Sequence, residues 1–255
     1  MFANYHTHTW RCRHAKGTER EYVEKAIERG LKILGFSDHS PYIFEGDYYS
    51  GHRMFADQTA DYVSTVLALK EEYKNDIQIH LGVEIEYYPK YWEQTVDFLK
   101  QYSIEYMILG QHFLENEINA WYSGDKSSDE KKLMQYCAQT IEAMKTGLIT
   151  YFAHPDLVRY EGDPEIYDQH IRGLCRESNR MNVPLEINFL GLHDNRFYPH
   201  EPFWTIAGEE KCAVILGADA HSAEAICDPD DIRKAMGLVE KYDLQVIDTV
   251  ELRRI

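Results

Sequence analysis

The stretch Asn4-Tyr5-His6-Thr7-His8-Thr9 follows an apolar start and predicts a short strand that runs into a polar turn. Side chains at positions i and i+2 of a strand point to the same face, so His6 and His8 point the same way. Two imidazoles on one face can bind one metal ion. Taken alone, the pair is better explained as two polar residues near a chain end, so the metal interpretation depends on the residues that follow.

Apolar runs typical of strands alternate with helical patterns through almost all of the 255 residues. Segment 245–250 is a candidate edge strand, and segment 189–202 is expected to be a loop. Such alternation implies parallel strands with right-handed crossovers. Seven strand-helix units predict an α/β fold, a closed or nearly closed barrel formed by a single domain over residues 1–255. After the first strand, we expect strands at 33–36, 77–85, 106–109, 148–153, 184–188 and 213–217.

The composition restricts the partners and the compartment. The chain carries a net charge of −16, which repels phosphate backbones and makes duplex nucleic acid an unfavourable partner. No apolar run is long enough to span a bilayer, and the N-terminus lacks the pattern of a signal peptide. Five widely spaced cysteines without a C-x-x-C motif suit a reducing compartment. We therefore expect a cytoplasmic protein that acts on a small molecule and binds neither nucleic acid nor membrane; the pattern leaves the oligomeric state open.

Residues that commonly bind metals recur where the predicted strands end. In (β/α) barrels the chemistry takes place at the C-terminal ends of the strands. A single candidate such as His112 is more often a hydrogen-bonded structural histidine. Ligand types at five or six separate strand ends, however, are hard to obtain by chance. The candidate ligands are His6, His8, His14, His39, Glu84, His112, His154, Asp219 and His221.

Two further carboxylates lie close to these positions. Glu84 and Glu86 share one strand face, so the pattern itself leaves both open. We prefer Glu84, in Gly82-Val83-Glu84, as a ligand that bridges two metals, which makes Glu86 a supporting or solvated residue. Asp38 precedes His39 and points away from it, so we expect support or capping rather than direct ligation.

The order of these motifs resembles that of a known superfamily over essentially the whole chain. It is similar to the polymerase-and-histidinol-phosphatase (PHP) superfamily, above all to its stand-alone histidinol-phosphate phosphatases. The resemblance implies a distorted (β/α)7 barrel with its active site at the C-terminal ends of the strands. It also implies three divalent metal ions, zinc first, with manganese, iron or cobalt as alternatives. The motifs are His6-x-His8, His14, Ser37-Asp38-His39, Gly82-Val83-Glu84, His112, Ala153-His154-Pro155 and Gly217-Ala218-Asp219-Ala220-His221.

The resemblance also implies how the metals are shared and what they do. One metal is expected on His6, His8, Glu84 and Asp219, a second on Glu84, His112 and His154, and a third on His14, His39 and His221. The implied reaction is hydrolysis of L-histidinol phosphate in histidine biosynthesis, with a metal-bridging hydroxide near Glu84 attacking phosphorus. The alternatives are a phosphatase for another small phosphate ester, and a nuclease or structural module associated with DNA polymerase. The absence of a polymerase region and the acidic charge count against the last.

A phosphate substrate needs positive charge, which the guanidinium group of an arginine can supply. Arg159 follows the fifth predicted strand and Arg196 the sixth, so we expect both to face the metals, to bind the phosphate and to assist catalysis. Arg53 is a third and weaker substrate-binding candidate. For each arginine, an ion pair with one of the many acids is the competing explanation. The group that protonates the leaving alcohol is left open between His193 and Asp194.

Overall fold

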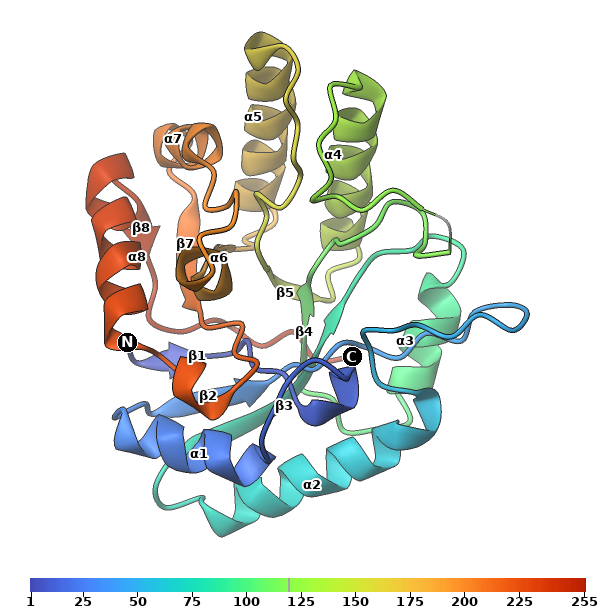
Figure 1. The fold of residues 1–255 in the computed structure, drawn as a ribbon, viewed down its shortest axis with the longest axis vertical. Helices are drawn as coiled ribbons and strands as arrows, with labels where there is room; N and C mark the ends of the chain where they lie inside the picture. The colour runs from blue at the N-terminus through green and yellow to red at the C-terminus, as the bar shows by residue number, and fades with distance from the viewer. Residues whose placement is uncertain (119) are drawn as a thin grey trace.

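A computed structural model describes residues 1–118 and 120–255. Eight parallel strands form one curved sheet in simple chain order (Figure 1). This order confirms the predicted α/β barrel class, because each strand returns parallel to its predecessor. The strands are β1 (Ala3–Asn4), β2 (Ile33–Phe36), β3 (Gln78–Ile85), β4 (Tyr106–Leu109), β5 (Ile149–Phe152), β6 (Leu185–Asn188), β7 (Ala213–Gly217) and β8 (Gln245–Val246).

The sheet curls so that its first and seventh strands meet at their C-terminal ends. Beyond β1, Thr7 forms a parallel bridge with Ala220, and the His8 amide donates to the Ala220 carbonyl at 3.0 Å. The Asn4 side chain accepts a hydrogen bond from the Ala218 amide at 2.8 Å. β8 pairs with the beginning of β7, outside this contact. Seven strands therefore surround the C-terminal mouth, and the candidate edge strand is shorter than expected.

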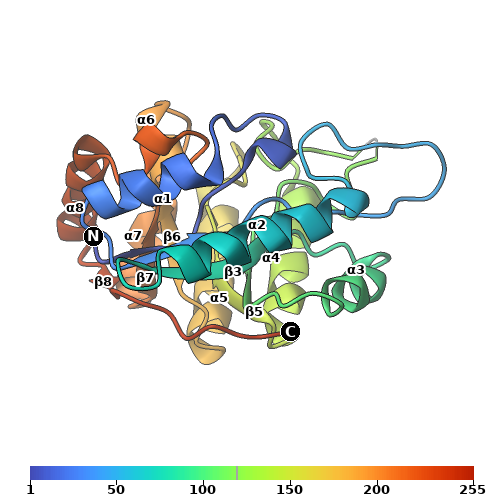
Figure 2. The ribbon, with the colours of Figure 1, turned by 90° about the horizontal axis from the view of Figure 1, so that it is seen from below.

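Helices follow the strands and cover the outside of the sheet (Figure 2). The residues that begin them are strong helix caps: Thr18 and Glu21 form a capping box, and Asp163 precedes a helix that starts with proline. Among the described residues, none of these helices is both long and apolar enough to cross a membrane. The helices are α1 (Glu19–Glu28), α2 (Thr59–Glu72), α3 (Trp92–Leu99), α4 (Glu130–Lys145), α5 (Pro164–Arg180), α6 (Phe189–His193), α7 (Glu201–Glu209) and α8 (Pro229–Tyr242).

The prediction of a loop over segment 189–202 is wrong. This segment contains the five-residue helix α6 and the start of α7. The Asn188 side chain caps α6 by accepting a hydrogen bond from the Gly191 amide at 3.2 Å. A helix this short has too few residues to show a 3.6-residue period, so the sequence pattern alone does not indicate it.

The interior of the barrel is filled, which confines the chemistry to one end. Tyr106 is fully buried, and its hydroxyl donates to the Tyr5 carbonyl at 2.7 Å. A Cβ atom at Gly82 would lie 2.4 Å from the Tyr106 ring, so this strand position needs glycine. Below this layer the C-terminal segment crosses the N-terminal mouth (Figure 2), where Val250 and Leu252 pack against the interior cluster.

Candidate metal centre

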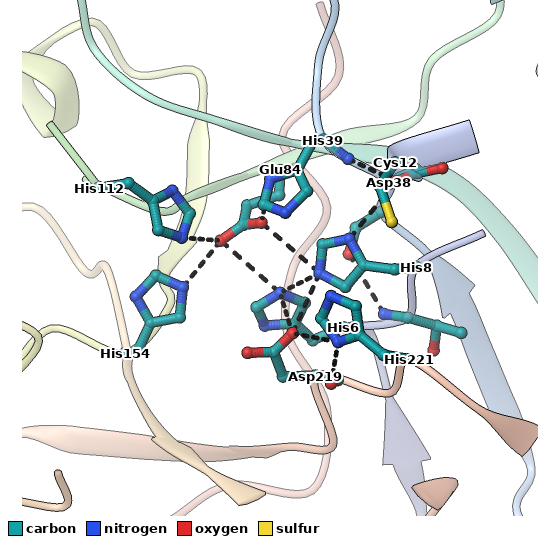
Figure 3. A network of polar contacts seen from close by, with 12 residues as sticks. His6, His8, Cys12, Asp38, His39, Glu84, His112, His154, Asp219 and His221 are labelled. Atoms are coloured by element: carbon teal, nitrogen blue, oxygen red, sulfur yellow. Dashed lines mark hydrogen bonds and ion pairs between the residues drawn. The ribbon is translucent and has the colours of Figure 1, made fainter. Parts of the chain in front are cut away.

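The nine candidate ligands converge at the C-terminal mouth of the barrel; eight of them are labelled in Figure 3, and His14 lies beside His39 and His221. Several groups of three bring one ligand atom from each residue within 4.8 Å of the others. The members come from the C-terminal ends of several strands or from the loops after them, as the parallel topology requires. The groups include His6, His8 and Asp219; His6, Glu84 and His154; His8, His39 and Glu84; and His14, His39 and His221.

Glu84 occupies the centre of this arrangement. Its side chain is 1% exposed, and its Oε1 atom lies 2.8 Å from Nε2 of His154 and 3.7 Å from Nε2 of His112. Its Oε2 atom lies 2.9 Å from Nδ1 of His39. A Cβ atom at Gly110 would lie 1.9 Å from Oε1, so a glycine there leaves the carboxylate its space. The two oxygens thus face different groups of histidines, which suits a bridging ligand.

Asp219 lies on the opposite side of the centre, at the end of β7. Its Oδ1 atom lies 3.0 Å from Nε2 of His8 and 3.4 Å from Nε2 of His6. The Asn188 amide group donates to its Oδ2 atom at 3.0 Å. The backbone at Asp219 has a φ of +47°, and at His154 a φ of +32°. Non-glycine residues rarely adopt positive φ, and such strain is concentrated at functional sites. These sharp turns aim both side chains into the mouth.

Three histidines are held from behind by buried carboxylates. Nδ1 of His6 lies 2.8 Å from Glu186. Nδ1 of His8 lies 3.4 Å from Asp38, and Nδ1 of His112 lies 3.0 Å from Glu86. Metal-binding histidines commonly donate their second ring N–H to a carboxylate. With Nδ1 as donor, Nε2 of each ring is free to face the centre.

The two carboxylates that share a face of β3, Glu84 and Glu86, have different contacts. The Glu86 side chain contacts His112 and Arg53, whereas Glu84 contacts five histidines of the centre. The structure thus places Glu84 among the candidate ligands, and Glu86 and Asp38 behind the histidines; the bridging role of Glu84 stays a prediction. Glu186 is absent from the candidates above. Its only sequence signal is an i, i+2 relation to Asn188 within β6.

The charges of the centre depend strongly on one another. Burial would raise the pKa of the Glu84 carboxyl, but the charges of His39 and His112 hold this pKa well below its usual range. Burial would lower the pKa of His8, but hydrogen bonds to Asp219 and Asp38 raise it to about 9. Burial and the charge of His8 lower the pKa of His221 to about 3. The pKa values of neighbouring imidazoles are therefore shifted in opposite directions around the two carboxylates.

The donor set fits divalent metal ions. Nδ1 of His221 donates to the Asp219 carbonyl at 2.9 Å, and its buried Nε2 atom has no hydrogen-bond partner among the described residues. Nδ1 of His14 likewise donates to the Cys12 carbonyl at 2.8 Å. A buried acceptor without a partner is costly, and a cation removes that cost. Imidazole and carboxylate are the usual ligands of zinc and related ions. Burial raises the pKa of the Cys12 thiol, which disfavours a thiolate ligand at this point.

A cavity of about 700 Å³ opens above the centre. Glu84, His154 and Asp219 form part of its floor. The remaining lining combines apolar and charged side chains. Among them, the guanidinium of Arg196 donates to Asp194 at 2.9 Å and to the Tyr198 hydroxyl at 3.1 Å. Lys16, which sequence reasoning missed, stands two residues after His14. The wall residues are Lys16, Phe113, Tyr122, Leu157, Leu190, His193, Asp194, Arg196 and Tyr198.

Among the residues that the structure describes, those that line this cavity include neither Arg159 nor Arg53. Arg159 pairs with Glu161 at 3.2 Å, and its guanidinium lies over the Phe197 ring. Arg53 is 1% exposed and contacts the buried carboxylates of Glu86 and Glu117. The structure therefore places Arg196 where a substrate can reach it, and it gives Arg159 and Arg53 other partners.

Comparison with known proteins agrees with this geometry. The family model described as the PHP domain matches residues 4–189. The chain is 28% identical over 229 residues to the "Probable histidinol-phosphatase" of Deinococcus radiodurans, a match that covers 85% of each protein. It is 24% identical over 248 residues to the histidinol-phosphatase of Bacillus subtilis, which covers 86% of this chain and 92% of that protein.

A solved structure shares the fold. It is the histidinol phosphate phosphatase of Lactococcus lactis, described in complex with zinc, L-histidinol and phosphate. The two chains superpose with a TM-score of 0.73, at 20% sequence identity, over 98% of each chain. This likeness confirms the barrel architecture expected from the motif series.

Proposed function

The chain belongs to the PHP domain family, and from that premise we propose that it hydrolyses L-histidinol phosphate to L-histidinol and inorganic phosphate. The observation that carries the proposal is the convergence of imidazoles and carboxylates around Glu84, beneath a cavity with Arg196 in its wall. The substrate is proposed because the relatives from Deinococcus radiodurans and Bacillus subtilis, each matched over most of its length, are named histidinol-phosphatases.

The proposal includes three divalent metal ions, with zinc as the first choice. The first would be held by His6, His8, Glu84 and Asp219, the second by Glu84, His112 and His154, and the third by His14, His39 and His221. The close group of His6, His8 and Asp219 supports the first site, and that of His14, His39 and His221 supports the third. The contacts of Glu84 with His112 and His154 support the second. Zinc in the Lactococcus lactis phosphatase supports the choice of metal. Such ions polarise phosphoryl oxygens and lower the pKa of bound water from 15.7 to about 7.

The chain's own residues would bind and orient the ester. The guanidinium of Arg196 and the ammonium of Lys16 would offset the charge of the phosphoryl oxygens from the cavity wall. Phe113 and Tyr122 would pack against the organic part of the substrate. Glu84, fixed between the histidines, would hold divalent ions at the floor of the cavity, where their charge would attract the phosphoryl group. Water would attack phosphorus from the side opposite the ester oxygen.

A small substrate in the cytoplasm is part of the same proposal. The net charge of −16 disfavours a polyanionic polymer, whereas histidinol phosphate also carries an amine and an imidazole that an acidic protein tolerates. The five cysteines are buried and free, which supports a reducing compartment.

The decisive experiment is a screen of phosphate esters with the purified protein, with metal analysis of the same sample. Histidinol phosphate is expected to give the highest kcat/KM among alkyl phosphates, aryl phosphates and nucleotides. Preference for another small ester would overturn the substrate and leave the metal chemistry standing. Full activity after exhaustive chelation, with metal content near zero, would overturn the metal-dependent mechanism.

Replacing the two arginines near the mouth should have unequal effects. Arg196→Ala is expected to lower kcat/KM on histidinol phosphate by at least ~30-fold, or about 2 kcal/mol, because it removes a charge-assisted contact from the cavity wall. Arg159→Ala should change it by less than ~3-fold, since its guanidinium pairs with Glu161 over the Phe197 ring. Steady-state kinetics at equal metal content tests this. A comparable loss of kcat/KM in both variants would show that Arg159 also contributes to phosphate binding.

A further inference from the structure

The pair formed by His193 and Asp231 stands at the wall of the cavity, outside the proposed metal ligands. His193 is the last residue of α6 and lines the cavity beside Arg196. Its Nδ1 atom lies 3.1 Å from Oδ2 of Asp231, in the first turn of α8. The Asp231 side chain is 3% exposed and that of His193 is 60% exposed. A buried carboxylate therefore contacts one ring nitrogen of an imidazole whose side chain is mostly exposed at the cavity wall.

The position of His193 is coupled to the centre through Asn188. The side-chain oxygen of Asn188 (Oδ1) caps α6 by accepting from the Gly191 amide, and the side-chain NH2 group donates to Asp219 at 3.0 Å and to Glu186 at 2.9 Å. The other end of α6 is held against α8, because the Lys234 ammonium donates both to the Leu192 carbonyl and to Asp231, each at 3.2 Å. Both ends of this one-turn helix are thus tied to neighbouring elements, which limits the positions open to the imidazole.

We infer that His193 is the general acid that protonates the leaving alcohol, and that Asp231 is its positioning residue. The inference rests on the proposed phosphatase activity. As water attacks, a bond forms between its oxygen and phosphorus, and the bond between phosphorus and the ester oxygen breaks. The electron pair of the broken bond goes to the ester oxygen, which takes the proton from Nε2 of His193. The attacking water releases a proton to solvent, and solvent reprotonates the exposed imidazole.

The other candidates in the cavity wall are less suited to this role. Asp194 already accepts hydrogen bonds from two nitrogens of the Arg196 guanidinium, at 2.9 and 3.2 Å, so this carboxylate oxygen is engaged as an acceptor. Burial raises the pKa of the Tyr198 hydroxyl, and the same cause raises that of Tyr122. His193, by contrast, is an imidazole at the cavity wall with a buried carboxylate 3.1 Å behind its Nδ1 atom, the arrangement that orients a general acid or base.

The role can be separated from phosphate binding by changing the leaving group. The alkoxide released from an alkyl ester is strongly basic and needs a proton, whereas a nitrophenolate leaves without one. Removal of a general acid should therefore damage hydrolysis of an alkyl phosphate far more than that of an aryl phosphate. Loss of a phosphate-binding group would damage both alike.

The experiment compares the holoenzyme variants His193→Gln and Asp231→Asn on histidinol phosphate and 4-nitrophenyl phosphate. His193→Gln is expected to lower kcat on histidinol phosphate by about 100-fold and on the aryl phosphate by less than ~3-fold. Asp231→Asn should show the same imbalance with a smaller loss. The matched control is His170→Gln, since His170 also faces a carboxylate, Glu130 at 3.6 Å, but lies on α5. It should behave as the unaltered protein.

Two outcomes would overturn the inference. One is an equal loss on both esters, which would make His193 a phosphate-binding or structural residue, and the other is no loss on either. Metal content is measured for every variant, so that loss of ions is recognised separately. If the protein prefers another alkyl ester to histidinol phosphate, the proposed function fails. The same comparison, made with that ester, still decides the role of His193.

Discussion

Glu84→Gln is expected to remove most of the turnover and to lower the metal content of the protein. Each carboxylate oxygen of Glu84 faces different histidines, so a neutral amide in its place would lose both the bridging charge and one oxygen ligand. The loss of metal-ion catalysis should lower kcat/KM by on the order of 10³-fold or more. Elemental analysis and steady-state kinetics on one preparation measure both effects. Thermal stability should fall together with metal content, because ions bound to the native state stabilise it.

Two further glutamate variants make this result specific. Glu240→Gln makes the same chemical change at an exposed position of α8 and should alter neither turnover nor metal content. Glu86→Gln leaves the bridging position intact and should reduce turnover less, since Glu86 acts through His112. If Glu86→Gln were the more damaging of the two for metal content, the bridging role would belong to Glu86 instead.

Arg53→Met is expected to lower the free energy of unfolding by about 3–5 kcal/mol, because it leaves buried carboxylates without their counter-charge. The Arg53 guanidinium lies 2.9 Å from Glu86 and 2.6 Å from Glu117. Burial would lower its pKa, but these two carboxylates raise it well above the usual value. Glu86 also holds His112, so the variant should bind metal more weakly, by roughly 10- to 100-fold. Urea unfolding followed by circular dichroism, and metal titration, measure the two effects.

A matched surface arginine controls for the loss of charge. Arg172 contacts Asp168, Glu209 and Glu210 on the outer helices, where solvent screens each pair, so Arg172→Met should destabilise the protein far less. Arg53→Lys should lie between the two, since lysine keeps the charge but loses the planar fork. A raised KM for histidinol phosphate with unchanged stability would instead support the substrate-binding role first considered for Arg53.

The three candidate arginines have different surroundings in the structure, which the sequence pattern did not predict. Arg159 and Arg196 both follow strands, and a position after a strand predicts the correct end of the barrel. It does not predict the side-chain partner. Arg159 meets Glu161 and Phe197, which are near it in sequence or in the neighbouring loop. Irregular segments have no sequence period from which such contacts could be predicted. These contacts can be identified only in the tertiary structure, where the loops pack together.

By itself, the sequence determined the barrel class and the mouth at which the nine candidate ligands gather. It could do so because the strands are parallel, and the C-terminal ends of parallel strands lie at one edge. The tertiary structure decided what depends on contacts between distant segments. It put Glu84 rather than Glu86 between the histidines, although both share one strand face. It also brought Glu117 to Arg53, 64 residues away in sequence, and Asp231 to His193, 38 residues away. Such pairs carry no local period, because they arise where loops and helix ends from separate units pack over one mouth.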